Sequence, residues 1–65
     1  MKYTWGDSAI HKTTNKACAV AGITPVDTEE QSKHFKAAVG SVLYTVEFTD
    51  GTDLLVPEDR LERML

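Results

Sequence analysis

The strongest structural signal in the chain is a run of alternating residues followed by a glycine turn. In residues 42–49, apolar and aromatic side chains occupy every second position, and mostly polar side chains lie between them. A period of two in β-branched and aromatic residues is typical of a half-buried strand. Asp50 and Gly51 follow, a pair that tolerates the positive φ angles of tight turns, and a second apolar run begins at Leu54. The sequence therefore predicts a β-hairpin with strands at 42–49 and 53–56.

The segment after the hairpin is expected to return the chain to the core. Pro57 has no N–H to donate to a β-ladder, and its fixed φ suits the first position of a helical turn. Residues 57–61 therefore predict one short 3₁₀ or α turn near the C-terminus, which places Leu61 on the core. Residues 62–65 fit either a further helical turn or a short closing strand, and both interpretations stay open.

Two more strands are expected before the hairpin. Residues 17–23 are a short apolar run of small side chains, which predicts a strand in which Gly22 marks a bulge or a close backbone approach. Residues 3–12 predict another strand after a turn at Gly6 and Asp7. The glycine turn can reset the alternation of this strand, so the facing of its aromatic side chains is not determined by the pattern.

Residues 27–40 form an insertion between the predicted strands, and both helix and loop are open for it. Thr28 and Gln31 have the spacing of a capping box, which favours a helix over 28–39 that ends at Gly40. The polar composition of the segment fits equally well with a mobile loop that rejoins the sheet near Phe35.

The chain is short enough that residues 1–65 form a single domain. With 65 residues, a folded chain buries about 60% of the surface that its unfolded form exposes. This leaves no room for a cleft between two lobes, and the four glycines are scattered singly, so they form no phosphate-binding loop. We therefore expect a binding protein, not an enzyme, with no catalytic residues and no cofactor.

Charge and cysteine content narrow the function further. The formal net charge is −3, and the acidic residues gather in 41–65, so general nucleic-acid binding is disfavoured. Cys18 is the only cysteine and is expected to be a small buried hydrophobe. With His11 and His34 it lacks the spacing of a zinc site, so no metal is expected.

The first residues lack the apolar core of a signal peptide, and no run is long enough to span a membrane, so we expect a cytoplasmic location.

The order of the predicted strands and turns along the chain resembles that of a known fold. The residues that carry this resemblance are Gly6-Asp7, Val20-Ala21-Gly22-Ile23, the run from Tyr44 to Gly51, and the run from Leu55 to Leu61. This layout resembles the SH3-like small-barrel superfold, in particular its Tudor-like and KOW-like bacterial relatives. The resemblance implies a mainly β fold, a partly open five-stranded barrel with a short helical turn near the C-terminus. The chain is also similar in layout to small immunity proteins of bacterial polymorphic-toxin systems.

The predicted function is a non-enzymatic interaction module that binds a protein or peptide partner. The resemblance places its groove between the loop at 12–16, the insertion at 27–40 and the Asp50-Gly51 hairpin. Trp5 is either a core residue, as expected in so small a domain, or an interface anchor, and the facing of His11 is equally open. The candidate partner contacts are Tyr3, Trp5, Lys12, Lys16, Glu47, Asp50 and Asp53.

Three alternatives to this function stay open. A nucleic-acid-binding or ribosome-associated module would require the lysines of the first forty residues to converge on one face opposite the acidic hairpin. Those lysines are Lys2, Lys12, Lys16, Lys33 and Lys36. A toxin-neutralising protein would use the acidic hairpin against a basic active site. A homodimer would form by pairing of exposed strand edges.

Overall fold

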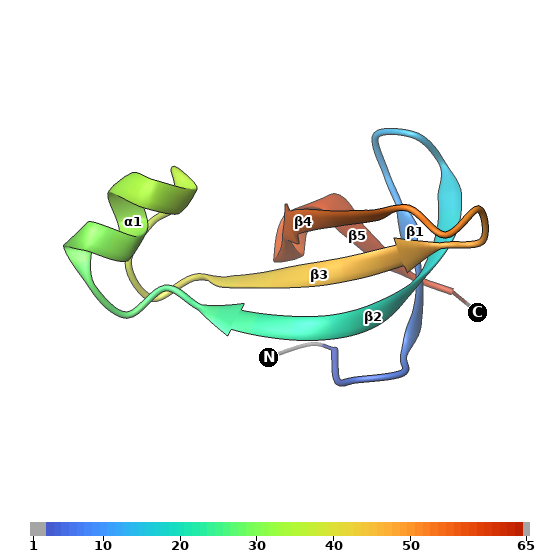
Figure 1. Cartoon of the computed structure of the whole chain (residues 1–65), viewed down its shortest axis with the longest axis horizontal. Helices are drawn as coiled ribbons and strands as arrows, with labels where there is room; N and C mark the ends of the chain where they lie inside the picture. Colours follow the sequence, from blue (N-terminus) through green and yellow to red (C-terminus); the bar gives the residue numbers. More distant parts are fainter. Residues whose placement is uncertain (1–2, 65) are drawn as a thin grey trace.

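Five strands form one antiparallel sheet in the order β4-β3-β2-β1-β5 (Figure 1). The strands are β1 (Ser8–His11), β2 (Lys16–Pro25), β3 (Val42–Phe48), β4 (Asp53–Pro57) and β5 (Leu61–Arg63). The computed structural model describes residues 3–64. The expectation of a mainly β fold with five strands is confirmed. Within the described residues the sheet is open and is not closed into a barrel, so β4 and β5 are its two edges.

The predicted hairpin is β3 and β4. The Gly51 N–H donates to the Phe48 carbonyl at 3.0 Å, and the Phe48 N–H donates to the Thr52 carbonyl at 2.8 Å. Gly51 has a φ of +88°, the left-handed conformation that glycine adopts without steric cost. The turn is thus a tight four-residue turn with glycine at a bulge, and it sets a register in which Glu47 lies opposite Asp53.

Strand β2 is longer than predicted and contains an irregularity at the expected glycine. Its pairing with β3 shifts register between Val20 and Gly22. A Cβ built at Gly22 would lie 3.3 Å from the Cβ of Thr45 on β3. Gly22 therefore marks both a bulge and a close approach of the two strands, as its position in the sequence predicted.

Strand β1 follows a hydrogen-bonded turn, and this turn decides the facing of Trp5. Ala9 and His11 are buried, with exposed fractions of 0% and 5%. Trp5 lies one residue before Gly6, whose φ is +88°, and it is 72% exposed. The interpretation of Trp5 as a core residue is wrong, because the turn removes it from the alternation of the strand that follows.

The C-terminal segment contains a 3₁₀ turn η1 (Glu58–Arg60) and then β5. The predicted helical turn is confirmed, and of the two alternatives for the last residues the closing strand is correct. Strand β5 pairs with β1, with His11 opposite Leu61 and Ala9 opposite Arg63. Leu61 is 4% exposed, so the turn does return it to the core.

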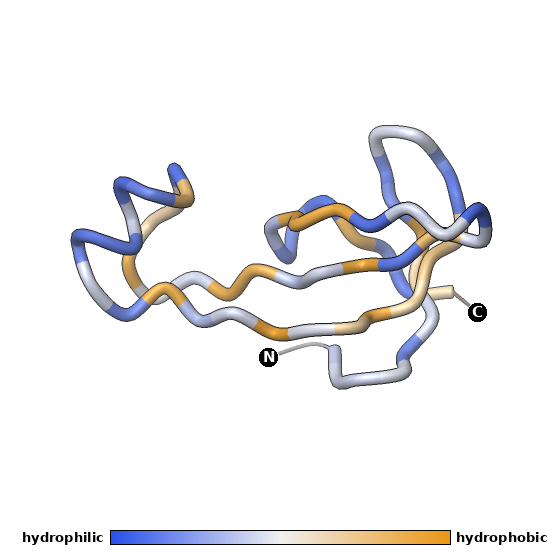
Figure 2. Tube along the Cα trace, viewed as in Figure 1, coloured by the Kyte–Doolittle hydropathy of each residue, from blue (hydrophilic) through white to orange (hydrophobic). Residues whose placement is uncertain are grey.

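The insertion contains a short helix α1 (Glu29–Phe35). Its capping box is present, since the Gln31 N–H donates to the Thr28 hydroxyl and the Gln31 side chain accepts from the Thr28 N–H. The helix ends at Lys36, which adopts a left-handed φ of +56°, so the predicted end at Gly40 is wrong. Figure 2 shows mostly hydrophilic residues along α1, and none of its residues is buried.

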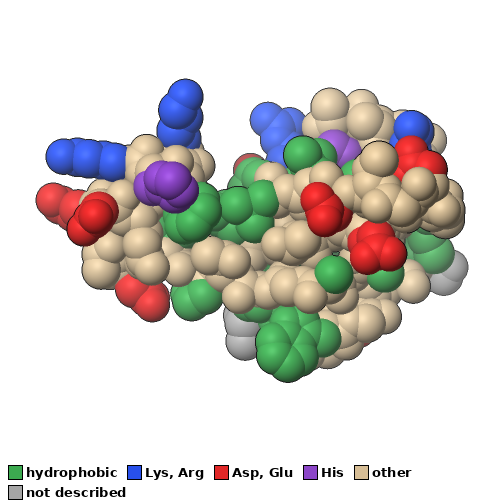
Figure 3. Space-filling view, viewed as in Figure 1, with side chains coloured by type: hydrophobic (Ala, Val, Ile, Leu, Met, Phe, Trp, Pro, Cys, Tyr) green, Lys and Arg blue, Asp and Glu red, His purple; other side chains and the backbone are tan. Residues whose placement is uncertain are grey.

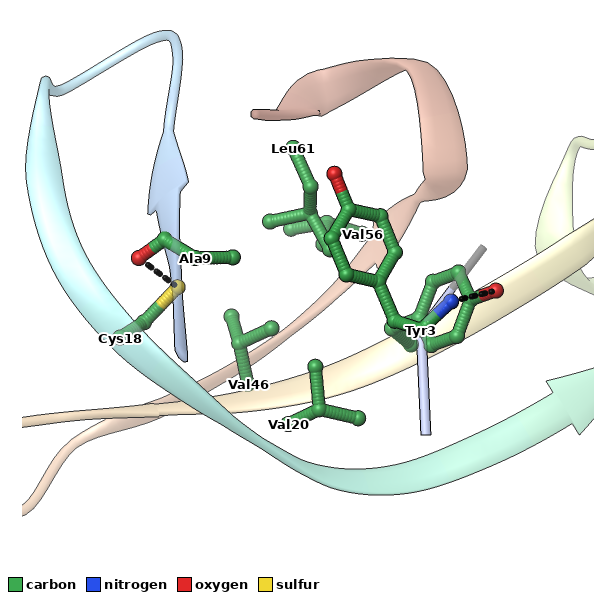
Figure 4. Packing of buried hydrophobic residues seen from close by; sticks show 8 residues of the cluster. Tyr3, Ala9, Cys18, Val20, Val46, Val56 and Leu61 are labelled. Carbon is green, nitrogen blue, oxygen red and sulfur yellow. Dashed lines mark hydrogen bonds between the residues drawn. The ribbon is translucent and has the colours of Figure 1, made fainter. Parts of the chain in front are cut away.

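The main core lies inside the curved sheet and receives a residue from every strand (Figure 4). Its members are Tyr3, Ala9, Cys18, Val20, Tyr44, Val46, Val56 and Leu61. Cys18 is buried, as expected, and its thiol donates to the Ala9 carbonyl at 3.5 Å. Val26 and Leu43 are also buried, at 0% and 4% exposed, but they lie outside this cluster, toward the α1 end of the sheet.

Candidate functional site

Trp5 is the most exposed large apolar side chain among the described residues. Its backbone is nevertheless well held. The Asp7 N–H donates to the Thr4 carbonyl at 3.1 Å, and the Thr4 N–H donates to the Asp7 carboxylate at 3.0 Å. The Gly6 N–H donates to the Val20 carbonyl on β2 at 2.9 Å, which ties the turn to the sheet. Figure 3 shows hydrophobic surface protruding over this N-terminal turn.

Tyr3 belongs to the core and not to the surface. Its ring is 4% exposed and meets the ring of Tyr44 edge-on, with centroids 5.4 Å apart. Arg63 places its guanidinium carbon 5.6 Å from the centroid of the Tyr3 ring. Burial raises the pKa of the Tyr3 phenol. This candidate contact residue therefore supports the fold from inside and offers little surface to a partner.

The acidic candidates lie on the β3–β4 hairpin, and one of them has a defined local structure. The Asp50 carboxylate accepts hydrogen bonds from the Thr52 hydroxyl at 2.6 Å and the Thr52 N–H at 3.0 Å. These bonds, with a smaller contribution from Lys16, hold the pKa of Asp50 below its ordinary value of 3.8. Glu47 and Asp53 face each other across the hairpin and are exposed.

The basic candidates Lys12 and Lys16 flank the β1–β2 turn, which hydrogen bonds hold in place. The Lys12 N–H donates to the Arg60 carbonyl at 2.9 Å. His11, which is buried, has its Nδ1 3.0 Å from the Thr14 hydroxyl, and its ring packs near Phe48. Lys16 and Asp50 line one hollow of about 290 Å³, so this turn and the hairpin do lie together.

The predicted groove between three segments does not form. The β1–β2 turn and the β3–β4 hairpin lie at one end of the molecule, and α1 lies at the other (Figure 1). The reason is the length of β2, whose ten residues (Lys16–Pro25) continue past Ser8, the residue at which β1 begins. The insertion at 27–40 therefore extends from the far end of the β2–β3 ribbon and cannot line a groove with the other two segments.

The lysines also do not converge on one face. Lys33 and Lys36 lie on α1 and at its end, whereas Lys16 lies beside the acidic hairpin and Lys12 beside η1. Figure 3 shows basic side chains at both ends of the molecule. Lys2 lies outside the described residues. The prediction that the lysines converge on one nucleic-acid-binding face is therefore wrong for the four lysines that the structure describes.

The sequence interpretation allowed for exposed strand edges but did not identify the β4 edge or its exposed leucines. Leu54 and Leu55 on β4 are 44% and 40% exposed, and β4 ends the sheet. The signal for this was present, because two consecutive leucines in a strand must face opposite sides of the sheet. One of them therefore had to lie on the face away from the core.

Within residues 3–64, no three His, Cys, Asp or Glu side chains are grouped so that they could hold a metal ion. The single helix of this part of the chain is far too short and polar to cross a membrane. Comparison of the chain with known protein families, curated proteins and solved structures finds no match.

Proposed function

We propose that this chain is a non-enzymatic interaction module that binds a protein or peptide partner. The observation that carries the proposal is Trp5, a large aromatic side chain that is 72% exposed. Tryptophan is enriched among the residues that dominate binding energy at protein interfaces, because it buries a large area with few rotatable bonds.

The turn that presents Trp5 strengthens this interpretation. Four hydrogen bonds fix the backbone from Thr4 to Asp7, two of them to the backbone of Val20 on β2. A side chain on a fixed backbone loses less conformational entropy when it binds than one on a loose terminus. The 72% exposure of Trp5 leaves most of its ring available to a partner.

The charged candidates remain available to a partner. Glu47, Asp50 and Asp53 on the hairpin, Lys16 beside it and Lys12 beside η1 are all exposed. Exposed charges at the rim of an interface affect the association rate and the choice of partner more than the affinity. We place the module in the cytoplasm of a bacterial cell, on the basis of its resemblance and of a single cysteine that makes no internal disulfide.

The test compares capture of partners by the native chain and by Trp5→Ala. Because Trp5 is the only tryptophan, its fluorescence emission reports directly on its own burial. We expect partners from the host to shift the Trp5 emission of the native chain to shorter wavelengths. The same partners should no longer be captured by Trp5→Ala. Val39→Ala is the matched control, since Val39 is 51% exposed near α1. Equal capture by native chain and Trp5→Ala, or binding only to oligonucleotides with a steep salt dependence, would contradict the proposal.

A further inference from the structure

Strand β4 has an outer edge to which no strand of residues 3–64 is paired. In an antiparallel pair, alternate residues bond to the neighbouring strand and the others point their backbone groups away from it. The Phe48 N–H bonds to the Thr52 carbonyl, so the register places Leu54 and Val56 in bonded pairs with β3. The N–H and C=O groups of Asp53 and Leu55 therefore point outward. Pro57 has no N–H and ends this outward row.

Apolar side chains lie on both faces of this edge. Leu54 shares a face with Val56, which is buried in the core, and Leu55 lies on the opposite face. Both leucines remain about two-fifths exposed, at 44% and 40%. An extended segment laid along β4 would cover both leucines and also satisfy the outward backbone groups.

The charges around the edge indicate which segment fits. At the start of β4, the exposed carboxylates of Glu47, Asp50 and Asp53 outnumber Lys16. Two hydrogen bonds from Thr52 hold the Asp50 carboxylate in place at the hairpin turn. The start of the edge thus favours a positively charged partner.

The other end of β4 leads into a groove with balanced charge. This groove, of about 580 Å³, lies between η1 and the segment that joins α1 to β3. It contains Glu58 and Asp59 together with Lys36 and Arg60. Figure 3 shows the surface hollowed between α1 and the rest of the molecule. This end favours an uncharged part of a ligand.

The same charges argue against a second copy of this chain as the occupant. Two β4 strands paired antiparallel around Leu55 would bring Asp53 of each copy next to Pro57 of the other. Asp50 and Asp53 of one copy would then lie near the balanced set of Lys36, Glu58, Asp59 and Arg60 of the other. A second copy therefore brings no net positive charge to the acidic start of β4, whereas a basic segment does.

We propose that the outer edge of β4 binds an extended peptide segment by antiparallel strand addition, with its uncharged N-terminal part in the groove and its basic C-terminal part beside Asp53. Antiparallel pairing is favoured because it is the more stable arrangement per residue. This inference deepens the proposed function and rests on it, because it names the chemistry of the partner and a second contact surface besides Trp5.

The test follows amide shifts of ¹⁵N-labelled full chain during addition of the peptide acetyl-Thr-Val-Thr-Val-Lys-Lys-amide. We expect the largest shifts at Asp53 and Leu55. Replacing the two lysines by glutamates, or moving them to the N-terminal end, weakens binding about three- to fivefold per charge pair. N-methylation of the peptide residues whose N–H groups face β4 abolishes it, because the side chains stay but the donors are lost.

A charge exchange separates the proposed contact from a general charge effect. Asp53→Lys weakens binding of the lysine peptide and improves binding of the glutamate peptide. Glu30→Lys makes the same change in net charge on α1, where Glu30 is exposed, and leaves the preference for lysine unchanged. Equal responses of the two variants, or shifts that spare β4, would overturn the proposal.

Three further results distinguish failure of this proposal from failure of the proposed function. Shifts at β4 that depend on protein concentration without peptide would show that a second copy occupies the edge, and the proposal would be wrong. Loss of partner capture by Trp5→Ala with no peptide effect at β4 would overturn this inference and leave the proposed function intact. Peptide binding at β4 with partner capture independent of Trp5 would support this inference and would overturn the role of Trp5 as the contact that carries the proposed function.

Discussion

Tyr44 has a polar group at the end of a fully buried side chain. The residue is 0% exposed, and its hydroxyl donates to the Glu58 carboxylate at 2.6 Å. The same oxygen accepts the Tyr3 N–H at 3.5 Å. This one hydroxyl therefore links β3 to the 3₁₀ turn and to the N-terminal segment. The link uses a hydrogen bond to a charged acceptor, which is stronger than a neutral one.

Replacing Tyr44 by phenylalanine is expected to destabilise the fold by about 1–2 kcal/mol. The change keeps the ring in the core but removes the hydrogen bonds of the hydroxyl to the Glu58 carboxylate and to the Tyr3 N–H. Urea unfolding measures the difference. Trp5→Phe is the control and is expected to stay within about 0.5 kcal/mol, since Trp5 is exposed. A Tyr44→Phe variant as stable as the native chain would show that the hydroxyl does not hold these segments together.

Thr52→Val is expected to raise the pKa of Asp50 toward 3.8, its ordinary value. The native pKa is lowered mainly by the Thr52 hydroxyl, and valine cannot donate that hydrogen bond. A lowered carboxyl pKa contributes stability that is fully present above pH 3.8 and is lost as the pH falls through the folded value. The variant should therefore lose less stability on acidification below pH 3.8. Carboxyl chemical shifts of Asp50 during an acid titration measure the pKa, and an unchanged midpoint would contradict the assignment.

At the element scale, the hairpin was predicted correctly because its cause is local, the Asp50-Gly51 turn. Gly22 was recognised as a bulge from its residue type, although its close contact is with Thr45 on β3. The spacing of Thr28 and Gln31 favoured a helix, which the sequence left open against a loop. The end of the helix was predicted wrongly, because Lys36 adopts the left-handed conformation without being glycine. The N–H groups of Lys36 and Ala37 both donate to the Ser32 carbonyl. Residue types alone do not predict this arrangement.

Thr28→Ala is expected to unravel α1 while the sheet stays folded. A helix of seven residues is too short to be stable by itself, and its capping box satisfies donors that would otherwise lose their partners. Loss of the cap costs about 1 kcal/mol locally. Cα chemical shifts over Glu29–Phe35 should move toward coil values, while those of β1 and β5 stay unchanged. Glu30→Ala lacks this effect, because Glu30 has no part in the capping box. Retained helical shifts in Thr28→Ala would show that packing, and not the cap, maintains the helix.

At the scale of the whole molecule, the sequence could not predict where the insertion lies. Strand patterns indicate which residues alternate but not how far a pair of strands continues past its neighbours. Here β2 and β3 stay paired from Cys18 opposite Phe48 to Pro25 opposite Val42, beyond the end of β1. The molecule is therefore elongated, with extents of 33 × 21 × 19 Å. Of the three segments of the predicted groove, the loop at 12–16 and the hairpin do lie together, and the insertion lies elsewhere.

The elongated shape also separates two groups of buried residues. The main core lies between the five strands, whereas Val26 and Leu43 are buried near α1 and are not part of it. The backbone of Val26 already closes the end of the ribbon, because its N–H donates to the Ser41 carbonyl and its carbonyl accepts the Gly40 N–H. The sheet thus has a complete hairpin end without the helix.

Replacing residues 27–40 by an Asn-Gly turn should therefore leave the five-stranded sheet folded. The shorter connection reduces the entropy lost on closing the loop, a gain of about 1–2 kcal/mol. Partial exposure of Val26 costs a similar amount, at about 0.8 kcal/mol per uncovered CH₂ group. These effects oppose each other, so we expect the free energy of unfolding to change by less than about 2 kcal/mol. Urea unfolding and the ¹⁵N amide spectrum measure the result. An unfolded variant would show that the α1 end is an integral part of the core, whereas unchanged amide shifts in β1, β4 and β5 would show that the sheet and the Trp5 turn form the stable unit.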